Sequence, residues 1–228
     1  MKAFDEMTGF ADAGANTLYA GVAKWLEETP SETLSARRAQ AELFFRRLGV
    51  TFAVYGEAEA DERIIPFDII PRVIAQNEWR QIEAGARQRV AALNAFLADI
   101  YGPQECLKAG VIPEELIYTN PQYRVEAAGL KPPKGVWVHV AGIDIVRTGP
   151  SEFFVLEDNA RTPSGVSYML ENREAMMRLT PELFSRHRVA PVETYTDSLL
   201  ATLRSVAPAG AGADPTVVIL TPGRFNSA

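Results

Sequence analysis

Residues 136–168 constrain this chain more than any other stretch, because apolar strand-like runs there contain acidic residues. Residues 136–146 are almost continuously apolar and β-branched, which is typical of a strand covered on both faces, yet Asp144 lies among them. Turn-forming residues at 148–151 separate this run from a second predicted strand, 153–159. We therefore expect a β-hairpin with a carboxylate whose position calls for a functional explanation.

The second predicted strand carries two further polar side chains on one face. Alternate side chains of a strand share a face, so Glu157 and Asn159 should point the same way. If Asp144 lies directly opposite Glu157, residues 148–153 form the connection between the strands. Asp144, Glu157 and Asn159 would then converge on one side of the hairpin.

Two carboxylates and a carboxamide, with neither His nor Cys beside them, are suited to a hard cation. Mg²⁺ prefers a few carboxylates together with phosphate oxygens and water, whereas Zn²⁺ and copper prefer imidazole or thiolate ligands. The alternative is an ordinary turn whose acidic residues are solvated or paired with Arg147, Arg161 or Arg173. The spacing alone leaves both interpretations open.

Small polar residues follow the second strand and lead to a predicted helix. Residues 160–167 contain Arg161 and a Thr-Pro-Ser-Gly turn before the helix begins. A helix N-terminus with small residues and an arginine is suited to phosphate. The local chemistry therefore predicts a metal ion next to a phosphoryl group.

These residues also carry a resemblance to a known family. Residues 156–168 read LEDNARTPSGVSY and are followed by ENR at 171–173. This pattern resembles the signature of circularly permuted type 2 ATP-grasp proteins, which are similar to the synthetase domain of glutathionylspermidine synthetase. The similarity extends from about Phe67 to the closing residues 221–228. It implies a partial ATP-grasp fold of the α/β (α+β) class, with a mixed sheet and flanking helices.

The resemblance also implies roles for individual residues. Asp144, Glu157 and Asn159 would hold the Mg²⁺ of MgATP. The catalytic group would comprise Arg161 and Arg147, which neutralise phosphoryl oxygens, and Ser164, which holds phosphate or the acyl intermediate. The nucleotide contacts would come from Thr162 and Gly165. Synthetases of this type carry an arginine two residues before the first acidic ligand, where this chain has Gly142.

The implied activity is that of an ATP-dependent carboxylate–amine ligase, or of its N-terminal portion. Its partners would be a carboxylate and an amine, each a small molecule or a peptide. A second hypothesis is a non-catalytic binding or scaffold protein derived from an ATP-grasp half, which Gly142 favours. A metal-dependent phosphohydrolase is less favoured, because no obvious general base accompanies the carboxylates.

The rest of the chain predicts three parts. Residues 1–62 form an N-terminal helical segment, 63–206 the metal-ligand half, and 207–228 a linker with the first strand of a following unit. Residues 216–220 should be a buried parallel-type strand. We therefore expect the sequence to be a fragment, a truncated product or half of a split enzyme. It would pair with its missing C-terminal half or with a second copy.

Apolar residues at helical spacing predict the longest helix. The stripe should pack into the core and comprises Trp79, Ile82, Ala86, Val90, Leu93, Leu97 and Ile100. Of the two histidines, His187 is expected at the surface, and His139 is expected to be hydrogen-bonded in the core.

Composition excludes several classes of protein. Acidic residues outnumber basic ones by 29 to 23, and no basic block appears, so nucleic acid is not an expected partner. No stretch approaches the roughly 18 apolar residues of a membrane span, and the first ten residues lack a signal peptide's apolar run. We therefore expect a cytoplasmic protein without membrane contact.

Overall fold

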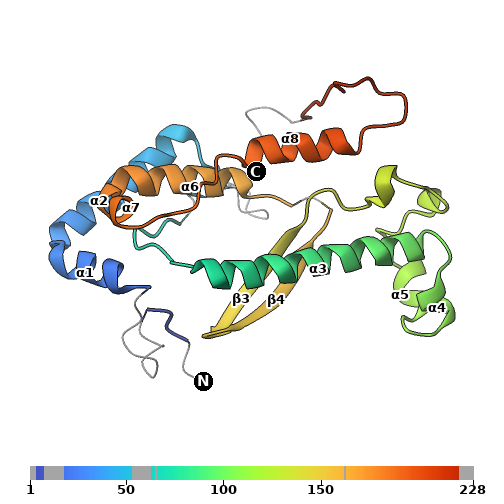
Figure 1. Cartoon of the computed structure of the whole chain (residues 1–228), viewed down its shortest axis with the longest axis horizontal. Coiled ribbons are helices and arrows are strands. Elements are labelled where there is room, and N and C mark those ends of the chain that lie inside the picture. The colour runs from blue at the N-terminus through green and yellow to red at the C-terminus, as the bar shows by residue number, and fades with distance from the viewer. Residues whose placement is uncertain (1–3, 8–17, 53–62, 65, 162, 221–228) are drawn as a thin grey trace.

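The chain folds into helices and two small antiparallel sheets, as the computed structural model shows (Figure 1). It describes residues 4–7, 18–52, 63–64, 66–161 and 163–220. The helices are α1 (Ala20–Glu28), α2 (Ser31–Leu48), α3 (Gln76–Ile100), α4 (Glu105–Lys108), α5 (Glu114–Tyr118), α6 (Val166–Leu179), α7 (Pro181–Arg186) and α8 (Tyr195–Ser205). The strands are β1 (Thr51–Phe52), β2 (Arg63–Ile64), β3 (Gly142–Gly149) and β4 (Glu152–Asn159). The α+β class is confirmed, and both sheets in the described part of the chain are two-stranded.

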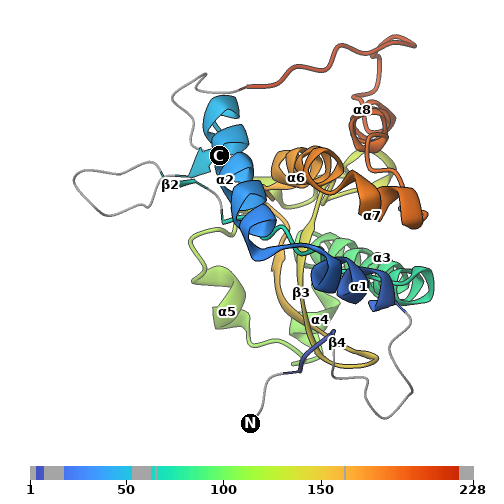
Figure 2. The same ribbon diagram turned by 90° about the vertical axis from the view of Figure 1, so that its left-hand side faces the viewer.

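Helices α1, α2, α6 and α7 gather on one side of the molecule and form what we call the helical layer (Figure 2). Two buried clusters lie in it: Tyr19, Val22, Trp25 and Leu183 in one, and Ala41, Phe45, Ile69 and Ala175 in the other. Each cluster combines residues from both sides of the domain boundary expected at residues 62 and 63. The three-part division stays a prediction, but packing crosses that boundary.

Helix α3 and the β3–β4 hairpin form a second part, which we call the hairpin layer (Figure 1). The predicted apolar stripe of α3 is largely half-buried, and Ile100 is the one fully buried residue of that helix. Trp79 is 55% exposed, so its predicted place in the core is wrong. A single helix lying against a two-stranded hairpin does not provide enough cover to bury the whole stripe.

The first hairpin strand begins six residues later than predicted. The backbone N–H groups of Trp137 and Val138 donate to Asn94 Oδ1 on α3, at 2.7 and 3.0 Å. This contact ties the segment to the helix, and the strand starts only at Gly142. His139 is exposed, so the expectation of a core histidine is wrong.

The apolar residues near the end of the described chain are not a buried strand. Residues 215–220 adopt no strand pairing among the described residues, and Ile219 is 87% exposed. The prediction of a buried strand at 216–220 is therefore wrong here, because no described segment lies beside it to accept its hydrogen bonds. None of the described helices combines the length and apolarity that crossing a bilayer requires.

Candidate metal site on the hairpin

The hairpin pairs its two acidic residues as the sequence predicts. Asp144 lies directly opposite Glu157, and Gly142 lies opposite Asn159. The connection is shorter than predicted: both strands extend toward the turn and leave only residues 150 and 151 between them. The predicted register around the acidic residues is therefore confirmed, whereas the predicted 148–153 connection is wrong.

Asp144, Glu157 and Asn159 form an exposed group on one side of the hairpin, which we call the acidic face. The Asn159 side-chain amide donates from Nδ2 to Glu157 Oε1 at 3.1 Å. This bond uses neither the carboxamide oxygen of Asn159 nor the second carboxylate oxygen of Glu157. The structure thus brings together the three residues that were predicted as metal ligands.

Two of the arginines considered as partners of the acidic residues, Arg161 and Arg173, bind other groups. Arg161 donates to the Gln122 side chain, and Arg173 donates to the backbone carbonyl of Ala190. Within the described ranges, neither Asp144 nor Glu157 forms an ion pair with a basic side chain. Like charges directly opposite each other destabilise a strand pair. A cation bound at the acidic face would reduce the repulsion between the carboxylates of Asp144 and Glu157.

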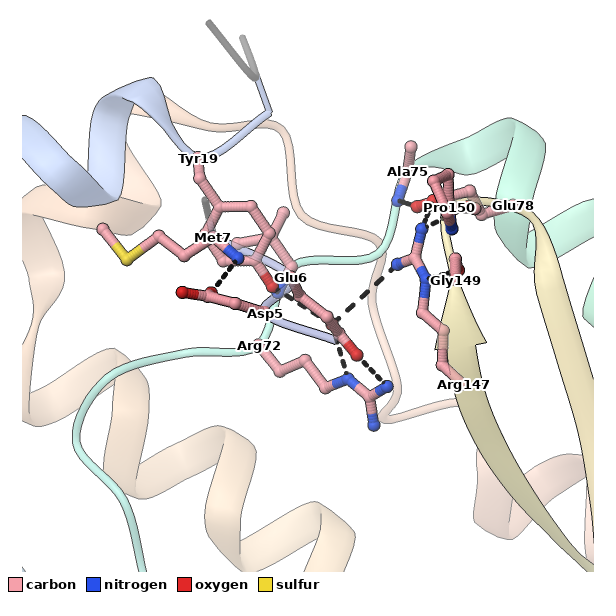
Figure 3. Close-up of polar contacts among 11 residues, drawn as sticks. Asp5, Glu6, Met7, Tyr19, Arg72, Ala75, Glu78, Arg147, Gly149 and Pro150 are labelled. Carbon is pink, nitrogen blue, oxygen red and sulfur yellow. Dashed lines mark hydrogen bonds and ion pairs between the residues drawn. The ribbon is translucent and has the colours of Figure 1, made fainter. Parts of the chain in front are cut away.

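Arg147 alternates with Asp144 along β3 and so lies on the other side of the hairpin. Its side chain is 2% exposed and lies among Glu6, Glu78, Gly149 and Pro150 (Figure 3). It forms an ion pair with Glu78 near the start of α3 and donates to the backbone carbonyls of Gly149 and Pro150. The structure therefore does not bring Arg147 together with the acidic face. Positions 144 and 147 differ by an odd number, so strand alternation already indicated opposite faces.

Arg147 and Arg72 also contact Glu6, one of the described N-terminal residues. Glu6 lies 3.8 Å from Arg147 and accepts hydrogen bonds from Arg72, which raise the pKa of that guanidinium (Figure 3). The hydroxyl of Tyr19 accepts the backbone N–H of Val73 at 2.9 Å, and burial raises the pKa of Tyr19. These contacts tie the two layers together.

Asp158 also faces away from the acidic face, toward α3. Arg89 donates from Nε to both carboxylate oxygens of Asp158, at 2.6 and 2.8 Å. This hydrogen bonding lowers the pKa of Asp158 below its ordinary value. Sequence reasoning placed Asp158 on the opposite face from Glu157 but did not identify Arg89 as its partner.

The predicted phosphate-binding residues lie at the start of α6. Gly165 precedes the helix with φ 94°, a left-handed conformation that favours glycine, and no side chain caps the helix. Ser164 is exposed next to it, whereas Thr162 lies outside the described residues. A Cβ at Gly142 would lie 3.2 Å from Pro163 Cβ, so this turn packs against the end of the acidic face.

The donor set of the acidic face fits a hard cation. It offers carboxylate and carboxamide oxygens, which Mg²⁺ accepts. Among the described residues, no group of three or more His, Cys, Asp or Glu side chains could hold a metal ion by itself. A cation here would consequently complete its shell with water or phosphate oxygens, as Mg²⁺ commonly does.

Comparison with known proteins places the chain among related sequences. A family model described as "A circularly permuted ATPgrasp" matches residues 71–228. An uncharacterized protein of Synechocystis sp. is 44% identical over 99% of this chain and 46% of its own length. An uncharacterized protein of Mycobacterium bovis is 46% identical over 99% of this chain and 40% of its own length. The "Putative glutamate--cysteine ligase 2-2" of Frankia casuarinae is 34% identical over 99% of this chain and 26% of its own length. The chain spans less than half the length of these relatives.

Proposed function

The chain belongs to the circularly permuted ATP-grasp family, and on that premise we propose that it forms the metal-binding part of an ATP-dependent carboxylate–amine ligase. The unpaired acidic face supports this proposal most strongly, because it gathers Asp144, Glu157 and Asn159 without a neutralising side chain among the described residues. The Frankia relative's name, which refers to a glutamate–cysteine ligase, agrees with this reaction class.

In the proposed reaction, the γ-phosphoryl group of ATP passes to a carboxylate oxygen and ADP leaves. The nitrogen of an amine then attacks the acyl carbon, phosphate leaves, and the amine loses a proton to solvent. A Mg²⁺ ion would supply neutralisation of charge on the phosphoryl oxygens. Asp144, Glu157 and Asn159 would orient that ion, and their rigidity depends on the hairpin.

The residues after the acidic face would hold the phosphate groups. Arg161 is exposed and, among the described residues, donates to a neutral side chain, Gln122, so its charge is available to phosphoryl oxygens. Ser164 and the free N–H groups that follow Gly165 would bind phosphate at the start of α6. Thr162 and Gly165 keep their proposed nucleotide contacts. Arg147 is left out of this set because its guanidinium is buried on the other side.

Gly142 favours a second candidate function, non-catalytic binding of a nucleotide or another ligand. Its position lies opposite Asn159, and a Cβ there would stand 3.2 Å from Pro163 and 3.4 Å from Asn159. A larger side chain would require those neighbours to shift. A site without an arginine here could bind MgATP and fail to transfer its phosphoryl group.

Turnover by variants separates the two candidates. The protein to be measured carries this sequence and has the length of its relatives. Mg²⁺-dependent ADP formation is compared between that protein and its variants Glu157→Gln and Asn159→Ala. A ligase loses turnover in both variants, because Glu157→Gln removes the negative charge of a metal ligand and Asn159→Ala removes the oxygen of another. Glu152→Gln on the same strand is the matched control and should keep activity.

Normal ADP formation in Glu157→Gln would refute the metal assignment. ATP binding without ADP formation in the unmodified protein, with any amine supplied, would instead favour the non-catalytic candidate.

A further inference from the structure

The β3–β4 hairpin contains one extra residue beside the acidic face. Beside the turn, Gly149 pairs with Glu152, and after a first register shift Arg147 pairs with Phe153 and Ile145 pairs with Val155. Beyond the second register shift, between Asp144 and Ile145, Asp144 pairs with Glu157, so Leu156 has no partner opposite it. Leu156 is thus a β-bulge, a device that redirects the side chains that follow it.

If the pairing of residues 145–147 is kept, removal of this bulge separates the residues of the acidic face. If the pairing of residues 145–147 with residues 153–155 continued regularly, Asp144 would lie opposite Leu156, and Glu157 would lie opposite Ile143. Glu157 and Asn159 would then point toward α3, and Asp158 would point outward, because a one-residue slip exchanges the faces of a strand. The proposed metal ligands are therefore defined by the position of the extra residue.

Two contacts with α3 lie on either side of the bulge. Glu78 binds Arg147, which pairs with Phe153, and the Arg147 guanidinium lies 5.2 Å from that ring. Arg89 binds Asp158. Phe153 and Asp158 are five positions apart, and an odd spacing on a regular strand places side chains on opposite faces. Both contacts with the same helix can form only if one extra residue lies between them.

We propose that the Arg89–Asp158 ion pair is a positioning pair, which holds the bulge at Leu156 and so keeps Glu157 and Asn159 beside Asp144. Its effect on cation binding rests on the proposed function, whereas its effect on the register does not. Asp158 is not a metal ligand in this account. It acts on the far side of the strand from the ion.

The test measures register and cation binding separately in Arg89→Met and Asp158→Asn. Cross-strand NOEs of Glu157 report the register, and electron paramagnetic resonance reports titration with Mn²⁺ alone. We expect the NOE from Glu157 to Asp144 to weaken as one to Ile143 appears, and Mn²⁺ affinity to fall at least threefold. The double variant Arg89→Asp, Asp158→Arg exchanges the two charges and should restore both the NOE between Glu157 and Asp144 and the Mn²⁺ affinity.

Arg87→Met is the matched control, because Arg87 pairs with Glu83 on α3 itself. It should change neither measurement. Unchanged NOEs between Glu157 and Asp144 in Arg89→Met and Asp158→Asn would overturn the positioning pair. A register change in a chain that never binds Mn²⁺ would uphold the pair and refute the cation site instead.

Discussion

The helical layer and the hairpin layer keep their shape by different means. The helical layer has two buried apolar clusters, centred on residues such as Phe45 and Trp25. The hairpin layer has a half-buried stripe and depends on charged contacts from α3, to Arg147 and Asp158. Apolar packing tolerates small shifts of register, whereas ion pairs specify which residue faces which. The layer that carries the candidate site therefore depends more on specific polar contacts than on apolar burial.

The sharpest test of this difference removes one aromatic ring from each layer. Phe45 is 1% exposed and lies 5.0 Å from the Phe67 ring, so Phe45→Ala should cost about 4 kcal/mol of unfolding free energy. Phe154 is exposed on the hairpin, and Phe154→Ala should change stability by less than about 0.5 kcal/mol. Urea unfolding followed by circular dichroism measures both. Equal costs would remove the distinction between the layers.

Replacement of Arg147 tests whether charge stabilises the hairpin layer. Arg147→Met should lower the unfolding free energy by about 3 kcal/mol, because it leaves the half-buried Glu78 carboxylate without its arginine. Arg161→Met is the matched control, since Arg161 is exposed, and it should cost less than about 0.5 kcal/mol. Urea unfolding again provides the measurement. Unchanged stability in Arg147→Met would return that arginine to the candidates for phosphoryl binding.

The sequence predicted the local part of this arrangement. Alternation placed Glu157 and Asn159 on one face of their strand, and the register considered there, with Asp144 opposite Glu157, is the one the structure has. The start of α6 after Gly165 was likewise visible in the Thr-Pro-Ser-Gly turn. Strand alternation and the start of a helix depend on neighbouring residues, so a pattern in the sequence is enough to reveal them.

Contacts between distant segments could not be predicted in the same way. The backbone N–H groups of Trp137 and Val138 donate to Asn94 instead of to a neighbouring strand. No local pattern in the sequence predicts these hydrogen bonds. The partner of Asp158 lies 69 residues away on α3. The bulge at Leu156 follows from such contacts, because its position depends on what each side of the hairpin binds.

Titration of the purified chain with Mn²⁺ is the first measurement to make, because it shows whether the acidic face of the hairpin binds a divalent cation. Calorimetry should show one site in the unmodified chain, about tenfold weaker in Asp144→Asn, which corresponds to about 1.4 kcal/mol. Asp197→Asn, an exposed acidic residue on α8, is the control and should leave the affinity unchanged. Equal affinities in all three proteins would contradict the account.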